Sequence, residues 1–218
     1  LSPTFTVDWS GTDAGAGIAT YTIFVSEDGG PFVAFLSGTT ATSAPFTGQA
    51  GHSYAFYSQA TDLMGYVEPA PARADAGTAV GGNGGGRMTL TVNSLVLNGQ
   101  VLANGDPGFG FSLRTSGAGS GGAIRIDVGT LSGSGAIQAI GGVGGTNGTA
   151  GDGGGGRIAI YYTTLSLPTA NITARGGILS RVGAAGTIYL KGPAPDIGDL
   201  IIDNGNGASG QVTPLRTA

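Results

Sequence analysis

A glycine followed by alternating apolar residues recurs four times in the second half of the chain. The starting glycines are at positions 86, 122, 156 and 186, and each copy is followed by a shorter apolar stretch (100–105, 136–142, 171–177 and 199–205). One such unit cannot bury its apolar side, whereas four stacked units can. The repeat therefore predicts a parallel β-solenoid of about four coils over residues 80–218. The aliphatic positions expected to share its core are Met88, Leu90, Val92, Ile124, Ile126, Val128, Ile158, Ile160, Ile188 and Leu190.

Glycine is the most unusual component, with 45 of the 218 residues. The chain is nevertheless 40% hydrophobic and only 10% charged, which is unlike a disordered chain. No strict Gly-X-Y period is present, so collagen is excluded. We expect glycine to form sharp corners of the coils, where it reaches positive φ without a Cβ clash. The runs 117–122, 141–145 and 151–156 are accordingly expected to project as loops along one edge.

Residues 1–72 follow a different pattern, with short alternating strands separated by turn residues. Phe5, Val7 and Trp9 point to one side, with polar residues between them, and similar alternation follows Tyr21 and Tyr54. The spacing predicts six or seven short strands in an immunoglobulin- or fibronectin III-like β-sandwich with Trp9 in its core. The proline-rich segment 68–72 is expected to be the exit linker.

Charge and composition exclude several functional classes. The net charge is −4 and the basic residues are scattered, so a nucleic-acid partner is not expected. No apolar run is long enough to span a bilayer. There is no cysteine, so neither disulfides nor thiolate metal sites are available. The first residues, Leu-Ser-Pro, suggest a part of a longer chain, and a tandem array is the corresponding hypothesis.

The sequence offers little for catalysis, and we predict that the chain is not an enzyme. His52 is the only histidine and is interpreted as a turn residue. Four arginines could form a basic cleft: Arg87, Arg125, Arg157 and Arg175. Of these, Arg87, Arg157 and Arg125 are the ones considered for near-equivalent coil positions, a pattern that suits either an acidic-glycan site or simply solvated strand ends. The carboxylates that could form a glycosidase-like pair, interpreted instead as turn and end residues, are Asp8, Asp13, Glu27, Asp28, Asp196, Asp199 and Asp203.

Two kinds of ligand or modification remain open. No cofactor is expected, although Asp13, Asp28 and Asp62 offer oxygen atoms in turns that suit calcium. The Gly-Asp-Gly run at 151–156 also resembles calcium-binding turns, without their nonapeptide spacing. Two N-glycosylation sequons begin at Asn147, within a glycine run, and at Asn171, at a strand start; Asn147 is the preferred acceptor.

Both halves resemble modules of large repetitive bacterial or archaeal surface proteins. The first half carries this resemblance in residues 5–13, 17–21 and 60–69, although apolar residues replace polar ones in its last turn. The second half is similar to glycine-rich solenoid segments through residues 153–160 and 186–189. The resemblance implies a cell-surface or extracellular location and tandem copies.

The expected function is therefore a non-catalytic structural repeat of an extracellular fibre or stalk that stacks head to tail with copies of itself. The alternative is an adhesin or carbohydrate-binding module, in which tyrosines such as Tyr161, Tyr162 or Tyr189 contact a glycan. In the structural hypothesis these tyrosines follow the alternation of their strands and only pack against the sheet.

Overall fold

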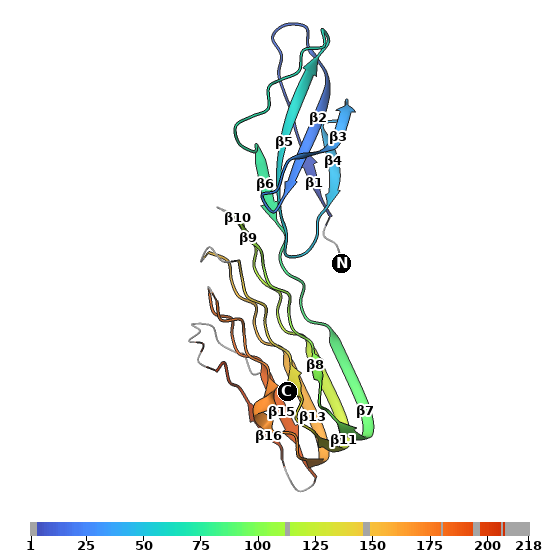
Figure 1. The fold of residues 1–218 in the computed structure, drawn as a ribbon, viewed down its shortest axis with the longest axis vertical. Coiled ribbons are helices and arrows are strands. Elements are labelled where there is room, and N and C mark those ends of the chain that lie inside the picture. Colours follow the sequence, from blue (N-terminus) through green and yellow to red (C-terminus); the bar gives the residue numbers. More distant parts are fainter. Residues whose placement is uncertain are drawn as a thin grey trace.

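The computed structural model describes residues 4–111, 114–145, 149–179, 181–193, 197–205 and 207. The molecule is elongated, with antiparallel strands at one end and parallel strands at the other (Figure 1). Its described residues form strands, connecting segments and one 3-10 turn, η1 (Thr169–Asn171), so the chain is all-β as predicted. Within this described part, no helix has the length and apolarity needed to cross a bilayer.

The first 79 residues contribute two antiparallel sheets that pack on each other through aromatic side chains. Phe46 lies between them, with ring centroids 5.2 Å from Phe35, 4.9 Å from Tyr54 and 5.1 Å from Phe56. Trp9 is buried as predicted, and its indole N–H donates a hydrogen bond to the Ala41 carbonyl at 2.8 Å. The sheets have the strand orders β1-β4 and β3-β2-β5-β6, with bounds β1 (Thr4–Asp8), β2 (Ile18–Glu27), β3 (Val33–Thr39), β4 (Ser43–Thr47), β5 (Ser53–Asp62) and β6 (Ala76–Ala79). Antiparallel pairing thus extends past residue 72, because β6 pairs with the start of β5.

The second half forms two mainly parallel sheets that share one aliphatic core. The larger sheet has the order β16-β15-β13-β11-β7 and the smaller one β14-β12-β8. A short hairpin, β9 (Gly110–Phe111) with β10 (Arg114–Thr115), lies near β6 of the antiparallel part (Figure 1). The bounds are β7 (Arg87–Val96), β8 (Gln100–Leu102), β11 (Ala123–Ser132), β12 (Ala136–Gln138), β13 (Arg157–Leu165), β14 (Ile172–Thr173), β15 (Thr187–Lys191) and β16 (Asp199–Ile201).

The repeat predicted from the sequence fixes the register of the parallel strands. We call each level of the stack a rung: β7 with β8, β11 with β12, β13 with β14, and β15. Ile126 pairs with Leu90 on one side and with Ile160 on the other, and Ile160 pairs with Leu190. All the aliphatic residues predicted to share the core belong to this one cluster. The prediction of a common aliphatic core is confirmed.

The last repeat differs from the prediction. The segment 199–205 was aligned with the second strands of the other units, but β16 pairs antiparallel with β15 in the larger sheet. An alternating apolar pattern is the same in both strand directions, so it could not distinguish the two arrangements. The consequence is that a reversed strand covers the edge of β15.

The glycine runs are not projecting loops, and that expectation is wrong. We call the following segments the glycine layer: 81–86, 103–109, 116–122, 139–145, 150–156, 174–177 and 182–186. Backbone hydrogen bonds join each segment to more than one neighbour; for example, Gly119 N–H donates to the Asp106 carbonyl at 2.9 Å and Gly121 N–H to Gly154 at 2.8 Å. Several of these glycines are buried. The segments therefore pack as a hydrogen-bonded layer inside the molecule.

Glycine is required in this layer by close backbone approach rather than by positive φ. Among the described residues between 81 and 193, only Gly133 has a positive φ. A Cβ at Gly119 would lie 1.7 Å from the Asn83 carbonyl oxygen, and one at Gly186 would lie 1.9 Å from that of Gly156. Such glycines recur three positions apart, which is the repeat of an extended polyproline II-like chain. The pairs are 82 and 85, 105 and 108, 119 and 122, 142 and 145, 153 and 156, and 183 and 186.

Replacing Gly153 with alanine should destabilise the protein, whereas replacing Gly151 in the same run should not. The new Cβ at Gly153 would lie 1.9 Å from the Gly119 carbonyl oxygen, while nothing lies within 4 Å at Gly151. We expect Gly153→Ala to lower the free energy of unfolding by about 3 kcal/mol or more. We expect Gly151→Ala to change it by less than about 1 kcal/mol. Urea denaturation of both variants measures this, and equal effects would contradict the close-approach explanation.

Candidate functional site

The outward face of the larger parallel sheet carries an arginine- and tyrosine-lined hollow. Because side chains alternate between the two faces of a strand, residues in register form rows across the outer face. One row is Arg87, Ala123, Arg157 and Thr187, and the next is Thr89, Arg125, Ala159 and Tyr189. The third is Thr91, Asp127, Tyr161 and Lys191.

The hollow forms because small and large residues alternate within these rows. Ala123 lies between Arg87 and Arg157 in its row, and Ala159 lies between Arg125 and Tyr189. The alanines leave a depression of about 360 Å³ that all three arginines and Tyr189 line. We call this depression the arginine hollow.

Neighbouring side chains hold the middle arginine of the hollow in place. Arg125 donates from Nε to Oδ2 of Asp127 at 2.8 Å and from Nη2 to Oδ1 at 3.0 Å. Its guanidinium carbon also lies 4.7 Å from the centroid of the Tyr161 ring, a cation–π distance. Tyr161 contacts Tyr189 edge to face at 6.0 Å, and the Tyr189 hydroxyl donates to the Ile197 carbonyl at 2.8 Å. One face of the guanidinium and both rings are thus positioned before any ligand arrives.

The charge of the arginine hollow is positive. Hydrogen bonding to Asp127 raises the pKa of Arg125, and the same bonds lower the pKa of Asp127. Arg87 and Arg157 are exposed and have no carboxylate partner among the described residues. Among the residues that the structure describes, no acidic one lines the hollow. Two arginines therefore remain available to an anion.

The sequence identified the arginines of this site but not its shape. Arg87, Arg125 and Arg157 come together as the sequence allowed, and Arg175 does not line the hollow. Tyr161 and Tyr189 face outward beside it, whereas Tyr162 packs against the aliphatic core. The role of the alanines was missed. Ala123 and Ala159 lie one and three positions after repeated glycines, and their role becomes clear only once the register is known.

His52 lies in a cluster with two carboxylates at the end of the antiparallel part. Its Nδ1 is 2.8 Å from Oδ2 of Asp28 and 3.0 Å from Oε1 of Glu27. The nitrogen and oxygen atoms with which the three residues could coordinate a metal ion lie within 4.8 Å of one another. The other Asp28 oxygen accepts from the Ser53 N–H at 2.8 Å. The Tyr54 hydroxyl donates to Glu27 at 3.0 Å, and burial is the main cause of its raised pKa. These bonds tie the β2–β3 turn to the start of β5.

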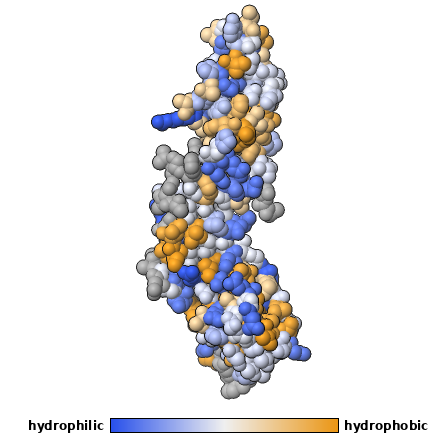
Figure 2. Space-filling model, viewed as in Figure 1, coloured by the Kyte–Doolittle hydropathy of each residue, from blue (hydrophilic) through white to orange (hydrophobic). Residues whose placement is uncertain are grey.

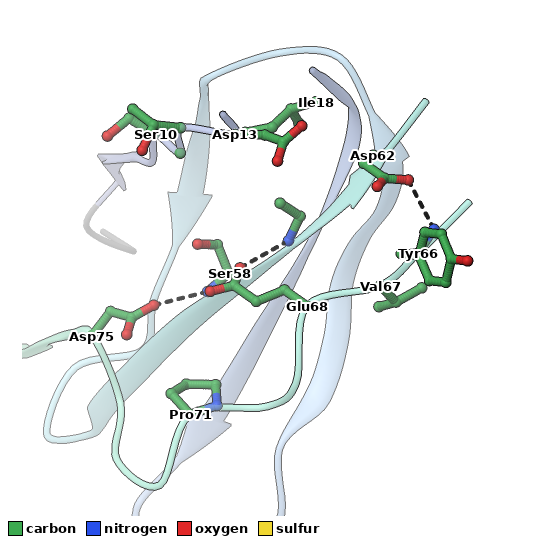
Figure 3. A pocket seen from close by; sticks show the side chains of 13 residues that line it. Ser10, Asp13, Ile18, Ser58, Asp62, Tyr66, Val67, Glu68, Pro71 and Asp75 are labelled. Carbon is green, nitrogen blue, oxygen red and sulfur yellow. Dashed lines mark hydrogen bonds between the residues drawn. The ribbon is translucent and has the colours of Figure 1, made fainter. Parts of the chain in front are cut away.

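A second hollow, of about 610 Å³, is lined by four carboxylates of the antiparallel part (Figure 3). Each carboxylate accepts a hydrogen bond from a backbone N–H. On the part of β5 that extends past its pairing with β6, the Asp75 carboxylate accepts from the Ser58 N–H at 3.1 Å. The Glu68 carboxylate accepts from the Ala60 N–H at 3.2 Å. Asp62 accepts from Tyr66 at 2.9 Å, as Figure 3 also shows. The acids therefore complete the open edge of β5 and the adjoining turns.

The carboxylates considered for calcium have structural partners of the same kind. Asp13 accepts from the Gly17 N–H at 2.6 Å, and Asp62 also accepts from Met64 at 2.8 Å. Asp152 accepts from the Gly144 N–H at 2.6 Å within the glycine layer. The expectation of no cofactor, with calcium as the open alternative, stays untested. Of the other acids considered for catalysis, Asp8 ends β1, Asp199 begins β16, Asp203 accepts from Gly205 at 2.7 Å, and Asp196 lies outside the described residues.

The two sequons differ in what the structure says of them. Asn147 lies outside the described residues. Asn171 ends η1, and its Nδ2 atom donates to the carbonyls of Ser134 at 3.1 Å and Gly135 at 3.0 Å. A glycan attached to this nitrogen would have to replace hydrogen bonds that link two rungs. Glycosylation of either asparagine stays a prediction.

The carboxyl group of Asp127 should titrate below its usual pKa as long as Arg125 is present. A lowered pKa in the folded state stabilises the fold above the ordinary aspartate value, and this contribution is lost as the pH falls through the lowered value. Carboxyl chemical shifts measured by NMR across acidic pH report the pKa. We expect Arg125→Gln to return it toward the ordinary value and Arg157→Gln to leave it unchanged. An ordinary pKa in the wild-type chain would contradict this geometry.

The chain was compared with protein-family models, curated proteins and solved structures, and none of the three comparisons gives a significant match.

Proposed function

We propose that this chain is a non-catalytic structural module of an extracellular fibre or cell-surface stalk, in which copies stack end to end. In this proposal residues 1–72 form an immunoglobulin- or fibronectin III-like sandwich and residues 80–218 a glycine-rich β-solenoid. The two packed antiparallel sheets support the first assignment. The in-register parallel strands, which contribute to two sheets around one core, support the second.

The observation that carries the proposal is an uncovered core at the first rung. Leu90 and Val92 are only partly buried, whereas Ile126 and Val128, which pair with them in the next rung, are buried. The same contrast separates Val101 of β8 from Ile137 of β12. Nothing in the described residues pairs with the outer edge of β7. An open sheet edge over a partly exposed core favours pairing with another strand.

Each end of the larger sheet has an edge strand with exposed apolar residues. β7 leaves one edge open, and β16 is the edge strand at the other end. Leu200 and Ile202, in and beside β16, are exposed. In Figure 2 apolar side chains also reach the surface near the lower end of β7, the strand in which Val96 is 64% exposed. We infer that the β16 end of one copy packs against the β7 end of the next.

The alternative, a carbohydrate-binding module, is favoured by one observation, the arginine hollow with its adjoining tyrosines. The hollow lies on the outward face of the larger sheet and reaches the edge strand β7 at Arg87 and Met88.

Lysines on the open edge strand should weaken self-association. Thr91 and Ser94 are exposed on β7, and two lysines there would place like charges beside an incoming strand. We expect the wild-type chain to form concentration-dependent oligomers and Thr91→Lys/Ser94→Lys to raise the dissociation constant at least tenfold. Sedimentation velocity measures this, and electron microscopy shows whether the oligomers are fibres.

The matched control places the same charges on a central strand. Thr163→Lys/Thr164→Lys changes two exposed residues of β13, a strand in the middle of the sheet; they lie beyond the residues paired with β15 and away from the β7 edge. This variant should associate like the wild type. A wild-type chain that stays monomeric at the highest attainable concentration would contradict the stacking proposal, and so would equal effects of the two variants.

A further inference from the structure

We infer that the arginine hollow is a binding site for an acidic polysaccharide, one that carries carboxylate or sulfate groups. This inference goes beyond the structural role and does not require stacking. It rests on the shape of the hollow, the arrangement of its arginines and the fixed aromatic side chains beside it.

The arginines are placed for a ligand with more than one anionic group. Arg87 and Arg157 lie in one row with Ala123 between them, so their Cα atoms are about 10 Å apart, twice the distance between adjacent strands. Arg125 projects from the intervening strand, two residues further along. Arginine binds carboxylate and sulfate oxygens through paired N–H groups. The guanidinium groups of Arg87 and Arg157, with that of Arg125 held by Asp127 beside them, can therefore contact anionic groups on successive units of a chain.

The floor and wall suit a sugar ring. The alanine floor, Ala123 and Ala159, provides a shallow apolar surface within about 360 Å³. Tyr189 lines the hollow, and its hydroxyl is held by the Ile197 carbonyl. An aromatic ring that is fixed in advance offers apolar contact area without a large loss of conformational entropy on binding. The site thus combines apolar contacts for a ring with cations for its substituents.

The charge of the rest of the chain favours a polysaccharide over a nucleic acid. The protein has 13 acidic and 9 basic residues. A nucleic acid carries a charge on every nucleotide and needs a basic surface along its length. Here only Arg87, Arg125 and Arg157 of the nine basic residues line the hollow, and Asp127 neutralises part of the adjoining row. A polysaccharide with spaced acidic groups fits this pattern better.

Binding by the full chain is tested with three polysaccharides: polygalacturonate for carboxylates, dextran sulfate for sulfates and unmodified dextran as the neutral reference. Isothermal titration calorimetry should show binding of at least one of the two acidic polymers and none of dextran. Arg87→Gln/Arg157→Gln should weaken that binding at least tenfold. Arg73→Gln/Arg181→Gln removes two exposed arginines that do not line the hollow and should leave the affinity unchanged.

A second variant tests the shape of the site without changing its charge. Ala159→Phe would fill the floor of the hollow and should also weaken binding at least tenfold, with circular dichroism confirming the fold. Equal binding of dextran, no binding of either acidic polymer, or unchanged affinity in both hollow variants would overturn the inference. Tighter binding of single-stranded DNA through the same arginines would overturn it in favour of a nucleic-acid site.

Discussion

The close approach of neighbouring backbones in the glycine layer is the constraint on which the parallel half depends. At Gly122 and Gly156 a Cβ would lie within about 2 Å of a carbonyl oxygen in the adjacent rung, well inside any van der Waals contact. The lateral hydrogen bonds of the layer exist only because these side chains are absent. Each glycine therefore removes an obstacle to hydrogen bonding as well as to packing.

Every rung joins two regions that are held together by different forces. On the strand side, aliphatic residues such as Ile126 and Ile160 bury apolar surface, which is the main favourable term in folding. On the glycine side, the buried positions are largely glycine backbone, satisfied by hydrogen bonds between segments. The strand side fixes the register, because the rows of aliphatic residues align only one way. The glycine layer then repeats in the same register.

The sequence was sufficient to predict the aliphatic core but not the glycine layer, the direction of β16 or the arginine hollow. The alternation at Ile124, Ile126 and Val128 recurs at fixed offsets, so both the strands and their register could be predicted. The role of glycine could not, because a sequence does not reveal whether glycine serves an unusual φ or a close neighbour. The direction of β16 was equally hidden, since alternation reads the same both ways. The arginine hollow depends on Ala123 and Ala159, residues that gain meaning only between their neighbours in a row.

The composition of the glycine layer also affects how stability changes with temperature. Unfolding of an ordinary core exposes apolar surface and raises the heat capacity, whereas exposure of polar groups such as peptides lowers it. A region whose interior is mainly peptide backbone, such as that around Gly142 and Gly153, shifts this balance toward a smaller heat-capacity change. We therefore expect a flatter stability curve, in which cooling weakens this region less than it weakens a core of aliphatic side chains.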